Sequence, residues 1–198
     1  SPDLDTRPPA PMRHAIGLRV QQCPTCGYCA GNIEEAHPGT AERVATDAYR
    51  ARLEDPAYPT LANRFRALAW LRGEEGRYAE AAWAAIQAAW MCDDHQVDEA
   101  AVACRREAAE RMVRAQERAQ PITQQQGAAP LLLVDLLRRA GDMALAHAVL
   151  EGHRETIPEG LLTQLVSFEE ALLQAGDRGC YTVARALAHA TAFAARRW

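Results

Sequence analysis

Lysine is absent from this chain of 198 residues, and all 22 basic side chains are arginines. Together with the abundance of alanine, this indicates a codon bias toward G and C rather than a function. Acidic side chains number 26, so the formal net charge is -4 and the pI is near 5.9. Proteins that bind nucleic acid or anionic membranes over a large surface are usually basic, so we expect neither partner.

Long apolar runs are also missing. A transmembrane helix needs about 18 or more consecutive apolar residues, and the sequence has no such run. Residues 1–5 lack the basic start and the apolar core of a signal peptide. Apolar residues still make up 48% of the chain, which favours a folded protein with one substantial core, or one core plus a small appendage.

Common catalytic motifs are lacking as well. The sequence has no phosphate-binding glycine loop, no Gly-x-Ser-x-Gly turn and no His-Glu-x-x-His helix. Of six cysteines, three lie within seven residues and the others fall in helical patterns. This distribution is typical of a metal site plus buried thiols in a reducing compartment, so we expect a cytoplasmic protein without a disulfide framework.

The cysteine cluster has the pattern of a metal knuckle, Cys23-Pro24-Thr25-Cys26-Gly27-Tyr28-Cys29. In a Cys-x-x-Cys pair a tight turn aims both sulfurs at one ion, and the following glycine permits an open backbone. We predict that Cys23 and Cys26 bind zinc. A redox pair or two unliganded thiols are the alternatives.

Zinc takes four ligands, and several residues compete for the remaining two positions. Cys29 extends the pattern to Cys-x-x-Cys-x-x-Cys, which iron–sulfur proteins also use, so iron is the alternative metal. His37 is a candidate in a loop. Cys92 and His95 stand three residues apart at the end of a predicted helix and would complete a Cys3His site; otherwise Cys92 packs against the core and His95 is exposed.

The stretch Leu61–Asp94 predicts a helical hairpin. Apolar residues recur at helical spacing on both sides of a break at Gly73–Gly76. Alanines in the second half allow close helix packing, and Trp83 and Trp90 fill the space beside them. Because two such helices cannot bury their apolar faces alone, further helices must pack on them.

The remaining sequence supplies those helices and a linker. Helices are predicted over residues 42–53, 98–120, 131–140, 143–151, 161–175 and 181–193. The proline-rich residues 1–12 are expected to run extended, with a disordered leader as the alternative, and Ile16–Gln21 alternates like a short strand. The segment near 121–130 reads as a linker. We therefore predict a leader and knuckle in residues 1–40 and a helical-repeat domain in 41–198.

The spacing of the turn glycines indicates a repeat. Gly141 and Gly176 are 35 residues apart, and Gly76 precedes Gly141 by 65, nearly twice that interval. Tetratricopeptide repeats have a period of about 34 residues. The sequence therefore predicts an all-α fold of tetratricopeptide-like helical hairpins, with a generic helical bundle as the alternative.

Four segments carry a family resemblance: residues 2–9 (PDLDTRPP), 23–28 (CPTCGY), 88–94 (AAWMCDD) and 177–183 (DRGCYTV). In this order they resemble a bacterial family of uncharacterised proteins that join a zinc-ribbon-like N-terminus to tetratricopeptide-like helices. In such relatives an earlier Cys-x-x-Cys precedes the first segment, so the resemblance implies that this chain holds half of a ribbon. It implies no established activity.

These features favour an interaction scaffold over an enzyme. We expect a helical-repeat groove that holds a peptide or partner protein, with the knuckle as a structural staple. The alternative is a metal-dependent redox protein or enzyme that uses the Cys23/Cys26/Cys29 cluster, or Asp93, Asp94 and His95 as acid–base groups. RNA binding through the arginine-rich helix is disfavoured, because its arginines alternate with glutamates.

Overall fold

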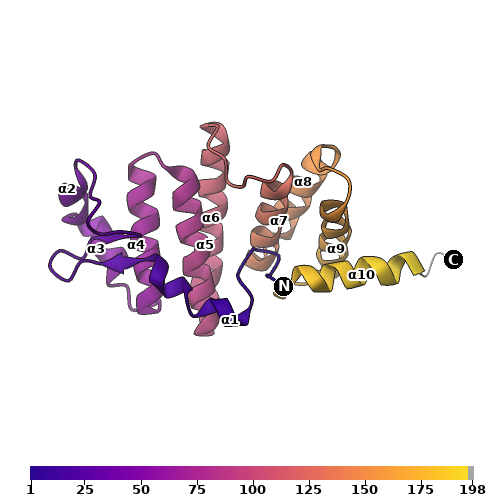
Figure 1. Cartoon of the computed structure of the whole chain (residues 1–198), viewed down its shortest axis with the longest axis horizontal. Coiled ribbons are helices and arrows are strands. Elements are labelled where there is room, and N and C mark those ends of the chain that lie inside the picture. The colour runs from indigo at the N-terminus through magenta and orange to yellow at the C-terminus, as the bar shows by residue number, and fades with distance from the viewer. Residues whose placement is uncertain (196–198) are drawn as a thin grey trace. The chain divides into compact units, whose positions relative to one another are not determined.

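The computed structural model describes residues 1–195, and most of them are helical (Figure 1). The helices are α1 (Ala10–Arg13), α2 (Thr40–Val44), α3 (Asp47–Leu53), α4 (Thr60–Glu74), α5 (Tyr78–Asp94), α6 (Asp98–Glu117), α7 (Ala128–Ala140), α8 (Met143–His153), α9 (Leu161–Ala175) and α10 (Val183–Ala195). Strands β1 (Gln21–Gln22) and β2 (Cys29–Ala30) pair antiparallel. The all-α prediction is confirmed at this level. Among the described residues no helix is both long and apolar enough to cross a membrane.

The described residues pack as two units. Unit 1 combines Ser1–Arg13 with the chain from Thr123 onward, and unit 2 holds His14–Ile122. The second boundary falls inside the segment predicted as a linker, near 121–130. The predicted division at residue 40 lies within unit 2, because the cysteine hairpin packs on α4 there.

Unit 2 is built on three consecutive helices, α4, α5 and α6, which stand side by side (Figure 1). Alanine-rich faces let α5 pack closely against both neighbours, as the sequence predicts. The turns between them use Gly76 and Gln96 in the left-handed region, at φ +72° and +57°. The fully buried core includes Tyr49, Phe65 and Trp90.

Unit 1 packs α7 against α8 and α9, and α9 against α10. Helices α7 and α9 end on Gly141 and Gly176, both with positive φ, as predicted from the turn glycines. The leader belongs to this unit (Figure 1). Its backbone pairs with the segment before α10: Leu4 N–H donates to Tyr181 O (2.8 Å) and Val183 N–H donates to Pro2 O (2.9 Å). Residues 1–9 therefore pair with unit 1 and are not helical, as predicted, and this contradicts the alternative of a disordered leader. The prediction is wrong for the end of the segment, because Ala10–Arg13 form the short helix α1, whose first turn can accept proline.

Three local predictions differ from the structure. Residues 42–53 form two helices, because Thr46 takes a non-helical conformation and caps α3 by accepting from Tyr49 N–H. Thr60 makes no side-chain cap, and Pro59 stands at that position of α4. The strand expected at Ile16–Gln21 is a 3-10 turn over Ile16–Arg19, followed by β1. A strand would place Ile16, Leu18 and Val20 on one face, but Ile16 and Val20 are buried whereas Leu18 is 80% exposed.

Candidate functional site

The cysteine knuckle forms the turn between β1 and β2. Cys23 N–H donates to Tyr28 O (2.8 Å), Gly27 N–H donates to Cys23 O (2.9 Å), and Gly27 has φ +79°. Hydrogen bonds from the Cys26 and Thr25 backbone to the Cys23 sulfur lower the pKa of that thiol. Such a turn stabilises a thiolate, which is the form that binds metal. Cys23 is half-buried and Cys26 is exposed.

Cys29 points into the core of unit 2. Its side chain is fully buried, and its backbone N–H donates to the Tyr49 hydroxyl (2.8 Å), which in turn donates to Gly27 O (3.0 Å). Burial raises the pKa of the Cys29 thiol to about 11, so it stays protonated at neutral pH. This arrangement ties the hairpin to α3 and gives Cys29 a packing role.

The other proposed ligands do not gather around the knuckle. Residues 1–195 contain no group of three or more His, Cys, Asp or Glu side chains that could hold a metal ion, so the Cys3His set is not assembled within them. Cys92 is buried and forms a hydrogen bond with the buried thiol of Cys104, which lowers the pKa of Cys92. His95 Nδ1 lies 2.9 Å from Met91 O, and His37 Nε2 accepts from Arg77 (2.9 Å).

Asp93, the first of the two aspartates at the end of α5, forms an ion pair. Both of its carboxylate oxygens accept from Arg105 Nη2, at 2.7 and 2.5 Å, and Arg105 is buried. This arginine of α6 therefore points into unit 2. Because the Asp93 carboxylate is held by Arg105, we assign Asp93 a structural role and not the acid–base role considered from the sequence.

A second cluster of perturbed groups lies in unit 1, where the sequence predicted none. Arg138 is fully buried and makes four hydrogen bonds. It donates to Glu169 Oε2 (2.8 Å) and to Asp135 Oδ1 (2.5 Å). It also donates to the main-chain carbonyls of Asp177 (2.7 Å) and Gly179 (3.0 Å). One side chain on α7 thus fixes α9 and the loop before α10.

The leader adds its own acidic residues to this region. Arg139 donates to Asp5 (2.5 Å), and Arg13 donates to Asp3 (2.7 Å). The Cys180 thiol forms a hydrogen bond with Asp3, and desolvation raises the pKa of Cys180 to about 12. Residues 2–9 and 177–183, two of the four segments that carry the family resemblance, therefore lie together here. Two features of the sequence could have indicated the cluster. One is that segments 2–9 and 177–183 both carry the family resemblance, and the other is that charged residues occur inside the apolar run of residues 131–140.

Several hollows on unit 2 are open enough to take a ligand. The first, of about 540 Å³, lies between the segments that flank the cysteine hairpin (Arg19 and residues 31–37) and helices α4 and α5, and we call it the hairpin groove. It is lined by Arg19, Gly31, Asn32, Glu35, His37, Leu68, Arg72, Arg77, Glu80, Trp83, Ala84 and Gln87.

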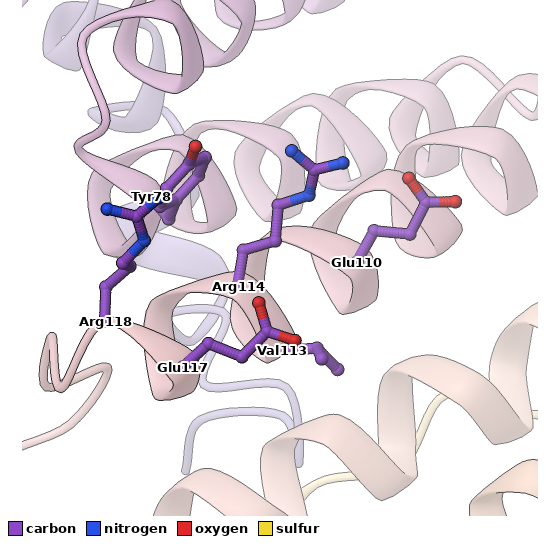
Figure 2. A pocket seen from close by; sticks show the side chains of 6 residues that line it. All are labelled: Tyr78, Glu110, Val113, Arg114, Glu117 and Arg118. Carbon is purple, nitrogen blue, oxygen red and sulfur yellow. The ribbon is translucent and has the colours of Figure 1, made fainter.

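The second hollow, of about 590 Å³, lies on α6 and the start of α5 (Figure 2). Tyr78 forms one end, with Arg118 beside it and the Arg114 guanidinium 5.9 Å from its ring centre. Glu110 and Glu117 balance the two arginines, so this hollow has no excess charge.

Comparisons with known proteins do not identify the chain: no family model matches it, and neither a characterised protein nor a solved structure gives a significant match. The proposals below therefore rest on the chain's own geometry.

Proposed function

We propose that the protein is a non-enzymatic scaffold that holds an extended segment of a partner protein in the hairpin groove, on tetratricopeptide-like helical hairpins. The lining of this groove is the observation that carries the proposal. Leu68, Trp83 and Ala84 supply an apolar surface, and Asn32 and Gln87 supply amides that can pair with a peptide backbone. The consecutive antiparallel helices α4, α5 and α6 support the repeat arrangement.

One wall of the groove is held rigid by ion pairs. Arg72 contacts Glu75 (2.7 Å), and Arg77 contacts Glu80 (2.7 Å) and lies 3.5 Å from Glu75. Trp83 is positioned by donating from Nε1 to Ile122 O (2.9 Å). A surface that is already ordered loses less entropy when a ligand binds. Because acidic and basic groups alternate along this wall, we expect the groove to select a segment by apolar and amide contacts more than by net charge.

Selection of random twelve-residue peptides by phage display tests the scaffold. We expect enriched peptides whose affinity falls by about tenfold or more in Trp83→Ala, since a buried tryptophan often dominates a peptide interface. Fluorescence anisotropy with a labelled enriched peptide measures the loss. The matched control is Tyr78→Ala, which removes an aromatic side chain from the second hollow, on α6 and the start of α5, and should leave the affinity unchanged. Failure to enrich any peptide, or an equal loss in both variants, would contradict the proposal.

We also propose that Cys23 and Cys26 supply two ligands of a structural zinc ion, as the family resemblance implies. The lowered thiol pKa of Cys23 and the tight turn support this assignment. Among the described residues no third His, Cys, Asp or Glu stands beside the pair, so the proposal concerns these two ligands alone.

Metal analysis tests this assignment. We expect purified protein to carry zinc, and Cys23→Ser and Cys26→Ser to lose nearly all of it, whereas Cys180→Ser, which replaces a cysteine of unit 1, should keep it. Inductively coupled plasma mass spectrometry gives the metal and its stoichiometry. Coloured iron in place of zinc would favour the redox alternative, and zinc retained by Cys23→Ser would refute the site.

A further inference from the structure

Two carboxyl groups in unit 1 each keep one oxygen without a donor. Arg138 donates hydrogen bonds to Oδ1 of Asp135 and to Oε2 of Glu169. The other oxygens, Oδ2 of Asp135 and Oε1 of Glu169, are buried and receive no hydrogen bond from a described residue. Yet the two carboxyl groups lie within hydrogen-bonding reach of each other. Two ionised carboxylates have only acceptors, so a bond between them requires a proton.

Charged groups surround the pair on several sides. Asp5 and Arg139 face Asp135 from the leader and from α7, and Arg138 lies against both carboxyl groups. The leader also buries Asp3 and Arg7, and Arg13 pairs with Asp3. From the loop before α10, Cys180 lies near Asp135, and Arg138 donates to two main-chain carbonyls. A proton on the pair removes the repulsion between its two carboxylates, which is strong in a buried place.

We propose that Asp135 and Glu169 share one proton in the closed form of unit 1, and that its loss releases the leader and the loop before α10. The pair is thus a pH-sensitive latch. Arg138 holds the loop through Asp177 and Gly179, and Arg139 holds the leader through Asp5. When the pair carries a second negative charge, both arginines are drawn toward it and its repulsion with Asp5 grows.

The direction of the pH effect follows from linkage. Burial, and then the charge of Asp135, raise the pKa of Glu169 from an ordinary 4.5 to about 8 in the closed form. Between these two values the closed form holds a proton that the open form has lost. The proton's contribution to the stability of the latch is therefore complete below about pH 4.5, falls as pH rises toward 8, and changes little above that.

Amide hydrogen exchange tests the latch at the two main-chain bonds that join the leader to the loop. The probes are the N–H groups of Leu4 and Val183. In the wild type we expect their protection, corrected for the intrinsic rate, to fall by up to about tenfold per pH unit between pH 5 and 8. In Glu169→Gln, whose amide can donate to Asp135 and which does not titrate, we expect protection to stay level over this range.

The matched control is Glu170→Gln, which removes the adjacent carboxylate of α9, one that contacts Arg154 outside the cluster. It should keep the wild-type slope. A level profile in the wild type, or a steep one in Glu169→Gln, would overturn the proposal. Carboxyl carbon NMR on the wild type gives a second reading that needs no stable variant: the Glu169 signal should titrate near pH 8, and a midpoint near 4.5 would overturn the latch.

Discussion

Replacement of Arg138 by methionine should lower the free energy of unfolding of unit 1 by about 3–5 kcal/mol, the range seen when one partner of a buried ion pair is removed. The guanidinium is fully buried and contacts two carboxyl groups and two main-chain carbonyls. Methionine fills much of the volume but donates no hydrogen bond. The variant therefore buries acceptors without donors and removes a positive charge between two acids.

Amide exchange over α7 and α9 is the measurement for this variant, because three of the four tryptophans, Trp70, Trp83 and Trp90, lie in unit 2 and dominate the fluorescence. Arg185→Met provides the control: Arg185 is exposed on α10, and its loss should cost less than about 0.5 kcal/mol. If the two substitutions lowered the free energy of unfolding equally, the hydrogen bonds of Arg138 would contribute no more to the stability of unit 1 than an exposed arginine does.

Truncation of Trp90 to alanine should destabilise unit 2 by about 3–5 kcal/mol, as expected for a large buried aromatic side chain. Trp90 is 1% exposed on α5, which lies between α4 and α6. Since neighbouring positions on this helix are already alanines, little side-chain material can move in to fill the cavity.

Urea unfolding followed by far-ultraviolet circular dichroism measures this loss, and Trp83→Ala serves as the comparison. Trp83 lies seven residues earlier on the same helix but lines the hairpin groove, so its removal leaves open surface instead of a closed cavity. We expect the smaller loss of stability there. A larger loss of stability for Trp83→Ala than for Trp90→Ala would contradict the conclusion that Trp90 lies in the centre of the core of unit 2.

The helices could be predicted because their signal is local. Helix α9 occupies the predicted residues, since its apolar spacing is regular and Gly176 ends it with positive φ. The failed strand at Ile16–Gln21 shows the limit of such signals. Its alternation in the sequence would bury Ile16, Leu18 and Val20 on one face of a strand, but in unit 2 the chain turns at Ile16–Arg19 and leaves Leu18 exposed.

The site was predictable only where a motif is contiguous. The turn from Cys23 to Tyr28 has the expected hydrogen bonds, because its geometry depends on residues within the turn. The inward position of Cys29 depends on the Tyr49 hydroxyl, twenty residues away. The contact between Asp5 and Arg139 spans 134 positions, and no periodicity or spacing rule pairs residues at that distance.

The leader's place in unit 1 has a consequence for the order in which the chain is made. Asp3 and Asp5 are synthesised before unit 2, but the helices that receive them come after the whole of unit 2. On the ribosome, unit 2 has all its residues available first, whereas unit 1 must wait for α9 and the loop that follows. Until then the acidic segment around Asp3 and Asp5 stays in solvent, where a nascent-chain factor or a protease can reach it.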